Sequence, residues 1–348
     1  MTADASPSLA YGQLTRRRQL LLAGLAAALL ASVAADLSFG PVGLDLGDIL
    51  TALLAPGEVD PRTRVVLWQI RLPGALMAVL VGAALALAGG VMQTILNNPL
   101  ASPFTLGLSA AAGFGAALSL AFGIALVPLA AFVVPVNAFL MAMATALVIH
   151  LLSLRRGVTA ETIVLFGIAL VFTFNALLAL VQYFASDRAV SAIVFWTLGN
   201  LTKASWESLG ITAAAIVLAV PVLVRQVWAL TALRLGDDKA ASFGIRVGRV
   251  RLLSLLAVSL LAAVPVAFVG TIGFIGIVGP HIARMLVGED QRYFLPTSSL
   301  CGALILSLSA IVSKALIPGT IFPIGVVTAL IGIPFFLSLI LSRKRASW

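Results

Sequence analysis

The chain has 348 residues, of which 61% are hydrophobic and only 10% charged, and its formal net charge is +9. This composition excludes a soluble domain and predicts an all-α integral membrane protein with several spanning helices. The positive charge does not indicate nucleic-acid binding, because the basic residues lie in short clusters between apolar runs rather than in one patch.

Ten apolar runs are each long enough to suggest a membrane-spanning helix, although the eighth is short and rich in Gly and Pro, which indicates a broken or tilted helix. We expect a cytoplasmic tail at 1–19, a single transmembrane permease domain at 20–341 and a basic cytoplasmic tail at 342–348. The runs are 20–39, 72–96, 100–122, 129–152, 162–184, 209–227, 252–269, 272–287, 298–316 and 324–341.

The first run follows three consecutive arginines, Arg16, Arg17 and Arg18, and contains Ser32-Val33-Ala34, which resembles a signal-peptidase site. The run is longer than the apolar core of a usual signal peptide, so we expect an uncleaved helix with its N-terminus in the cytoplasm. With ten spans, this orientation places sixteen of the 22 Lys and Arg residues on the cytoplasmic side. That bias is the positive-inside pattern and predicts that both termini are cytoplasmic.

The second run is expected to organise the fold. It opens on Arg71 and Pro73, and Pro suits the first turn of a helix. Small residues at Gly82, Ala86, Gly89 and Gly90 allow a neighbouring backbone to come close. The run breaks at Asn97-Asn98-Pro99, a polar turn tolerated only at the membrane surface or beside an enclosed cavity. The outer segment 40–70 before it is expected to fold against the membrane face.

A weak internal repeat relates the second and seventh to eighth runs. Gly89, Pro99 and Gly107 each have a counterpart 181 residues later, at Gly270, Pro280 and Gly288. An odd number of spans separates the two copies, so they would run in opposite directions, as the inverted repeats of many transporters do.

No catalytic or metal-binding constellation is present. The sequence lacks a phosphate-binding G-x-x-x-x-G-K-[ST] motif, and its single cysteine, Cys301, excludes a disulfide framework within the chain. Glu161 begins the fifth helix, where the helix dipole favours a carboxylate. The two histidines, His150 and His281, are expected at helix ends. Because no chain of buried Asp, Glu or His marks a proton path, an ion-coupled transporter is the weaker reading.

The cytoplasmic loop 230–251 contains a second informative stretch. Leu235 and Gly236 precede the acidic pair Asp237-Asp238, an Ala-rich run follows, and Gly244 ends it. This order predicts a short capped helix whose small apolar face could dock into a groove on another protein. An ordinary solvated loop helix is the alternative.

These stretches resemble the FecCD family of ABC importer permeases, the type II importers of iron–siderophores, haem and vitamin B12. The resemblance rests on Arg71-Leu-Pro73, on Gln93 and 98–103 with Gly107, on 235–244, on 270–284 and on 323–336. The motif residues of the stretch 270–284 are Gly270, Gly273, Gly276, Pro280, His281 and Arg284. The resemblance implies a ten-helix permease fold with an inverted repeat that dimerises around a translocation path.

The resemblance also implies roles for particular residues. The segment Leu235, Gly236, Asp237, Ala240, Ala241, Phe243 and Gly244 matches the helix that couples the permease to its ATPase. Asn98, Pro99 and Leu100, with Ala160 and Glu161, match the cytoplasmic gate. Arg71 matches an outer arginine that pairs with the binding protein, and Lys314 takes the place of another. Four positions depart from the family pattern: Gly74, Ala310, Lys314 and Ile321.

The implied function is that of the membrane-spanning subunit of an ATP-driven importer in the bacterial inner membrane, most consistent with ferric siderophore cargo. The partners would be a second permease copy or paralogue, two cytoplasmic ATPase subunits and an extracytoplasmic binding protein. This chain would bind no cofactor itself, since ATP and Mg²⁺ belong to the ATPase subunits. Haem, cobalamin or an oxyanion is the alternative cargo, and an ion-coupled secondary transporter is the alternative class.

Overall fold

The computed structural model describes residues 7–40, 43, 45–127, 129, 132–153, 155, 158–317 and 320–343, and the expected basic tail lies almost wholly outside them. Within this part of the chain the secondary structure is helical, apart from one isolated bridge between Ile317 and Thr320. The helices are α1 (Pro7–Ser38), α2 (Leu46–Leu54), α3 (Pro61–Val65), the π-helix η1 (Val66–Arg71), α4 (Leu72–Ile95), α5 (Leu108–Phe122), α6 (Val133–Ser153), α7 (Ala160–Phe184), α8 (Asp187–Thr197), α9 (Trp206–Val224), α10 (Val227–Leu233), α11 (Asp237–Ser242), α12 (Val247–Val269), α13 (Ile275–Val287), α14 (Gln291–Ala315) and α15 (Ile324–Arg343).

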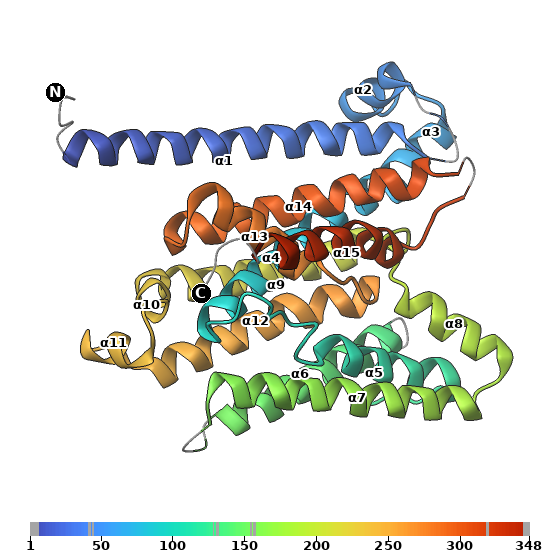
Figure 1. Cartoon of the computed structure of the whole chain (residues 1–348). Helices are drawn as coiled ribbons and strands as arrows, with labels where there is room; N and C mark the ends of the chain where they lie inside the picture. The colour runs from blue at the N-terminus through green and yellow to red at the C-terminus, as the bar shows by residue number, and fades with distance from the viewer. Residues whose placement is uncertain are drawn as a thin grey trace.

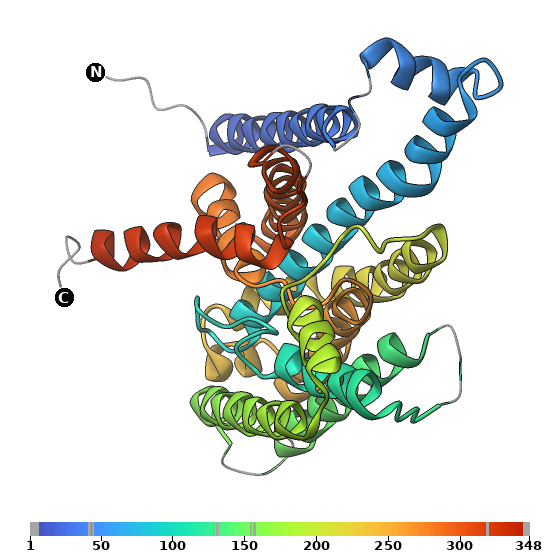
Figure 2. The same ribbon diagram turned by 90° about the vertical axis from the view of Figure 1, so that its right-hand side faces the viewer.

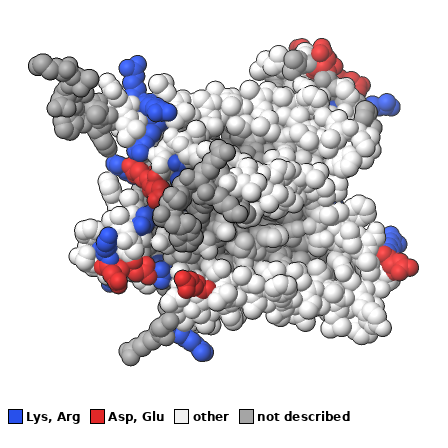
Figure 3. Space-filling model, viewed as in Figure 1, with Lys and Arg blue, Asp and Glu red and all other residues white. Residues whose placement is uncertain are grey.

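The helices lie in a bundle long enough to cross a membrane. Seven helices in the described part of the chain have the length and apolar composition of spans, and α5, α13 and the apolar part of α15 are shorter. Together they correspond to the ten predicted runs. In the view of Figure 3 the charged residues gather at the two ends of the bundle, and the band between them is almost free of charge. The left end of Figure 1 carries the start of α1 together with α10 and α11.

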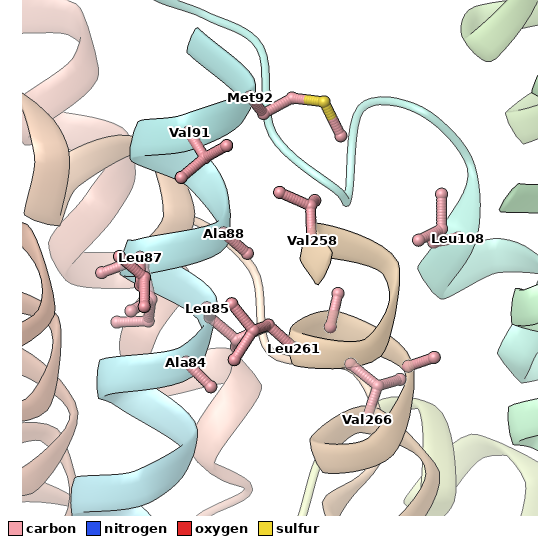
Figure 4. Packing of buried hydrophobic residues seen from close by; sticks show 14 of the residues in the cluster. Ala84, Leu85, Leu87, Ala88, Val91, Met92, Leu108, Val258, Leu261 and Val266 are labelled. Atoms are coloured by element: carbon pink, nitrogen blue, oxygen red, sulfur yellow. The ribbon is translucent and has the colours of Figure 1, made fainter. Parts of the chain in front are cut away.

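Helix α4 is the centre of the bundle, as predicted. It packs against α14, α12, α13 and α9, and its apolar side chains face Val258 and Leu261 of α12 (Figure 4). Close approach depends on small residues: a Cβ on Gly89 would lie 1.8 Å from the carbonyl oxygen of Gly276, and one on Gly82 would lie 2.4 Å from that of Gly302. Lipid supplies no hydrophobic force between transmembrane helices, so their association depends on close packing. Small residues allow the two backbones to come close enough for that packing.

The start of this helix differs from the prediction. The helical path does not open on Arg71 and Pro73 but runs continuously from Pro61 to Ile95, with η1 in the middle. Leu72 donates its backbone N–H to Leu67, five residues earlier, just before Pro73. Because a proline ring collides with the carbonyl four residues before it, the wider π-turn accommodates Pro73 without ending the helix.

The third predicted run begins too early. Residues 100–107 form turns, and α5 starts only at Leu108. Ser102 and Thr105 bond to each other's backbone N–H, at 3.0 and 3.2 Å, which offers the backbone an alternative to a helical turn. Gly107 follows with a φ of +84°, a conformation that a residue with a Cβ resists.

Two other expectations of local structure have clear outcomes. The described part of the segment 40–70 is folded, since α2 and η1 enclose a small core with the end of α1 and the start of α4. Trp68 donates from its indole nitrogen to the carbonyl of Ala52 at 3.0 Å. The register of the proposed repeat is wrong, because Gly89 lies inside α4 whereas Gly270 ends α12 with a φ of +77°. An inverted relation of the two halves in another register stays a prediction.

Several shorter elements were not predicted. Helix α8 lies between α7 and α9, capped by Ser186, and α10 lies in the loop before α11. Helix α9 begins at Trp206 rather than 209, because Ser205 and Ser208 form a capping box. Figure 2, turned by 90°, shows α1 and α7 at opposite edges of the bundle, with α4 crossing between them.

Candidate functional site

The predicted short helix in the cytoplasmic loop is confirmed as α11. It ends in a Schellman motif: Gly244 donates to Ala241 at 2.9 Å, and Ile245 donates to Ala240 at 3.2 Å. Gly244 has a φ of +79°, the left-handed conformation expected for such a stop. The loop geometry therefore depends on glycine at this position.

One side of α11 packs on the bundle and the other is exposed. Ala240 is fully buried, whereas Leu235 and Phe243 are 56% and 66% exposed. Ala241 and Asp238 are also exposed. Two large apolar side chains flanking a short helix at the charged end of the molecule form a surface suited to a protein partner. We call this set, Leu235, Ala241 and Phe243, the α11 surface.

The polar turn after α4 has the form expected from its sequence. Asn98 accepts a hydrogen bond from the backbone N–H of Leu100 at 2.9 Å, so its side chain occupies a backbone donor freed by Pro99. Asn97 has a φ of +44°, an uncommon value outside glycine to which asparagine is best suited. Leu100 is 46% exposed. Ala160 and Glu161, the other gate candidates, begin α7, which Thr159 caps.

Three arginines, two from helices and one just after a helix, hold the end of α4 and the turn after it. Arg284 of α13 donates to the side-chain oxygen of Gln93 at 3.0 Å. Arg251 of α12 donates to the carbonyl oxygen of Ile95 at 3.2 Å. The residue after α10, Arg234, donates to the side-chain oxygen of Asn97 at 2.9 Å. The contacted residues are therefore successive alternate positions along α4 and its turn.

The same arginines pair with carboxylates, and two of them, Arg234 and Arg284, share one. Glu289 pairs with Arg284, at 3.1 Å, and with Arg234, whose Nε lies 3.0 Å from the carboxylate. Arg251 pairs with Asp237, the first residue of α11, at 3.0 and 3.1 Å. A guanidinium has five donors in a rigid fork, so it can serve two partners at once.

The glycine-rich motif in residues 270–284 has a packing role. Gly276 lies against Gly89 and Leu85 of α4, and Gly270 ends α12 against the carbonyl of Trp196. Pro280 lies inside α13. His281 is not at a helix end, as expected, but in the middle of α13, where its ring contacts Phe335 of α15 edge-on at 5.8 Å. Gly273 precedes α13 in the break between α12 and α13.

At the opposite end, Arg71 and Lys314 are engaged within the chain. Arg71 is only 6% exposed and donates to the carbonyl oxygen of Leu37. Lys314 lies 2.8 Å from the carboxylate of Asp36, which is 1% exposed. The ion pair joins α1 to α14.

Both cations line a cavity of about 450 Å³ at this end. The four positions that depart from the family pattern, Gly74, Ala310, Lys314 and Ile321, all belong to its lining. The remaining walls come mainly from the residues just after α1, from η1, from the end of α8 with the segment after it, and from the approach to α15. The four departures are therefore clustered around one cavity.

Sequence reasoning missed four residues of these networks. Asp36 ends an apolar run, and an acidic residue in such a place signals an internal partner. Arg234 and Arg251 were missed because the positive-inside pattern already accounted for the basic residues near the cytoplasm. Glu289 was missed with them, because its partners are those arginines and Arg284. Among the described residues no cluster of His, Cys, Asp and Glu could hold a metal ion.

The fold and the two polar ends are those of a multi-pass membrane protein, and the comparisons identify it as a permease of the ABC class. Residues 27–342 match the FecCD transport family, so the chain belongs to the FecCD transport family. A protein of Methanocaldococcus jannaschii named as an ABC transporter permease is 38% identical over 89% of this chain and 90% of its own length. The molybdate import permease of Haemophilus influenzae is 33% identical over 93% of this chain and 96% of its own.

A solved structure supports the fold directly. It is described as an inward-facing conformation of a metal-chelate type ABC transporter, and it is 31% identical, with a TM-score of 0.82 over 93% of this chain and 99% of the solved one. Further relatives carry names for the import of ferric citrate (Bacillus subtilis), hemin (Yersinia pestis) and vitamin B12 (Salmonella typhi). The predicted type II importer permease fold is confirmed, and an ion-coupled secondary transporter is set aside.

Proposed function

We propose that this chain is the membrane-spanning subunit of an importer for ferric siderophores in a bacterial inner membrane. ATP would be hydrolysed by two separate cytoplasmic subunits, and a second permease copy or paralogue would complete the translocation path. The observation that carries the proposal is the α11 surface, an exposed apolar face at the charged end of a buried helical bundle. Figure 3 places this end where the basic residues gather, which supports a cytoplasmic location.

The proposed mechanism uses no chemistry on this chain. Binding of ATP closes the ATPase subunits, α11 moves with them, and the two permease copies change between outward-open and inward-open states. Asn98, Pro99, Leu100, Ala160 and Glu161 would line the cytoplasmic gate. Binding energy can shift such an equilibrium only if the partner binds the two states with different affinity.

The cargo assignment rests on the names of relatives and of one solved structure. Relatives named for ferric citrate and a structure named for metal chelates support an iron chelate, whereas others are named for molybdate, hemin and vitamin B12. Uptake by a deletion strain carrying the gene for this chain should be measured with ⁵⁵Fe-loaded siderophores, hemin, cyanocobalamin and molybdate. Uptake of the iron chelates alone supports the proposal, and uptake of one of the others replaces the cargo.

Docking of an extracytoplasmic binding protein is proposed at the end that contains Arg71 and Lys314. Basic residues at a partner surface mainly steer encounter, but Arg71 is buried here, so its charge acts from inside the cavity wall. Arg71→Glu should slow association with the binding protein and make the remaining rate less dependent on salt. The measurement is association with the nanodisc-held complex at two salt concentrations, with Arg188→Glu, an exposed site, as control. Equal rates at low salt would remove Arg71 from docking.

A further inference from the structure

The arginine contacts at the cytoplasmic end connect α11 to the turn after α4 by two independent routes. Arg251 binds the carboxylate of Asp237, the first residue of α11, and the carbonyl oxygen of Ile95, the last residue of α4. Arg234 lies two residues before Gly236, the N-cap of α11, and binds the side chain of Asn97. The two bonds end at Ile95 and Asn97, immediately before Asn98 and Leu100 in the chain.

We infer that Arg234 is a positioning residue that transmits the movement of α11 to the turn 96–100, with Glu289 holding Arg234 in place. This inference rests on the proposed role of α11 as the contact with the ATPase subunits. It assigns a function to residues outside the family motifs.

The geometry favours transmission over simple bracing. The side chains of Arg251 and Arg234 are 14% and 19% exposed, whereas their carboxylate partners Asp237 and Glu289 are 56% and 42% exposed. Arg251 donates to a carbonyl at a helix C-terminus, where the helix dipole favours a cation. Arg234 is held from the far side by Glu289, which Arg284 also binds. The Arg234 guanidinium is bonded to Glu289 and to Asn97, so it cannot move with α11 without displacing Asn97.

The turn is also poised to respond. Asn97 adopts a positive φ, +44°, that its side-chain bond to Arg234 helps to hold. Loss of that bond leaves a strained conformation with one support fewer. Two arrangements of the turn, with and without the bond, are the kind of discrete element that can carry coupling between sites.

The test uses Asn97→Gly and Asn97→Asp in the complete complex with its ATPase subunits. Glycine accepts the positive φ but removes the acceptor for Arg234, whereas aspartate keeps the acceptor. A cysteine at Leu100 reports the turn through cross-linking between permease copies, measured with and without Mg²⁺ and ATP. ATP hydrolysis is measured in the same samples.

We expect Asn97→Gly to hydrolyse ATP while its nucleotide-dependent change in cross-linking falls by roughly two- to thirtyfold. Asn97→Asp should retain that change. The control is Arg292→Gln, which removes an arginine at the same end whose ion pair with Asp290 does not involve α4.

Normal nucleotide-dependent cross-linking in Asn97→Gly would overturn the inference. Failure of the proposed function gives a different result. The Leu100→Cys parent, with Asn97 unchanged, would then show no ATP-dependent change in cross-linking at all. A response in that parent, lost in Asn97→Gly and kept in Asn97→Asp, establishes the connection.

Discussion

At the level of single residues, Gly244 shows how a local backbone requirement reaches function. Its φ of +79° is unfavourable for any residue with a Cβ, at a cost of roughly 1–2 kcal/mol. We expect Gly244→Asp to insert normally but to impair ATP-driven transport, because the end of α11 is displaced. The measurement is ATP-dependent uptake, normalised to the amount of protein in the membrane.

Gly248→Asp is the matched control for this change. A Cβ at either glycine would have no neighbour within 4 Å, but only Gly244 has a positive φ. The two substitutions therefore differ in backbone strain and not in crowding. Wild-type uptake by a normally expressed Gly244→Asp chain would contradict the coupling role of α11.

The ion pair of Asp36 with Lys314 is the second case at this scale. Removing one partner of a buried pair leaves an uncompensated charge and costs roughly 3–5 kcal/mol. Lys314→Met should therefore lower the unfolding temperature in nanodiscs clearly, and Asp36→Asn together with Lys314→Met should recover most of the loss. A single substitution as stable as the unmodified chain would show that the pair does not hold α1 to α14.

At the level of helices, the contact of α4 with α13 depends on backbone approach. A Cβ on Gly89 would lie within 1.8 Å of a backbone oxygen that cannot rotate away, so the two helices must separate. Gly89→Ala should destabilise the fold by roughly 1–3 kcal/mol, the cost of overpacking. The control is Gly24→Ala in α1, where nothing lies within 4 Å. Thermal unfolding of both variants decides the point.

Helix positions were predictable where apolar length alone decides them. Bonds between side chain and backbone set the boundaries that the prediction missed. Because of the bonds between Ser102 and Thr105, α5 begins later than predicted, and because of the capping box of Ser205 and Ser208, α9 begins earlier. The π-helix before Pro73 was beyond prediction, because periodicity indicates a helix but not a change in its hydrogen-bond spacing. Helix α8 was missed because it is short and partly polar.

Functional residues divide in the same way. The conformations of Asn98 and Gly244 follow from local sequence, so the reading from the sequence was right about both. The partners of Arg251 and Arg234 lie 156 and 137 residues away in the chain, at Ile95 and Asn97. No local pattern encodes such distances, so only the folded chain identifies these residues.

At the level of the whole molecule, burial is strongly uneven. The most apolar window of the span that contains α4 is 78% buried, whereas that of α7 is 11% buried. Large apolar side chains such as Phe172, Leu165 and Tyr183 cover the outside of α7. A transmembrane helix of this kind contacts either lipid or a second copy. The proposed dimer would place the start of α7 and the turn 97–100 of each copy near a common axis.

Cross-linking tests this arrangement. Cysteine at Asn98 or Leu100 should join the two copies in the outward-open state, which binding of ATP favours, and less in the inward-open state. Cys301, the only cysteine of the chain, is 3% exposed and stays unreactive, so the unmodified chain is the blank. Cysteine at Phe243, on the α11 surface, should join the permease to an ATPase subunit and not to its second copy. If Phe243→Cys reacts as expected while neither Asn98→Cys nor Leu100→Cys cross-links in any nucleotide state, the turn is not at the dimer axis and the gate lies elsewhere.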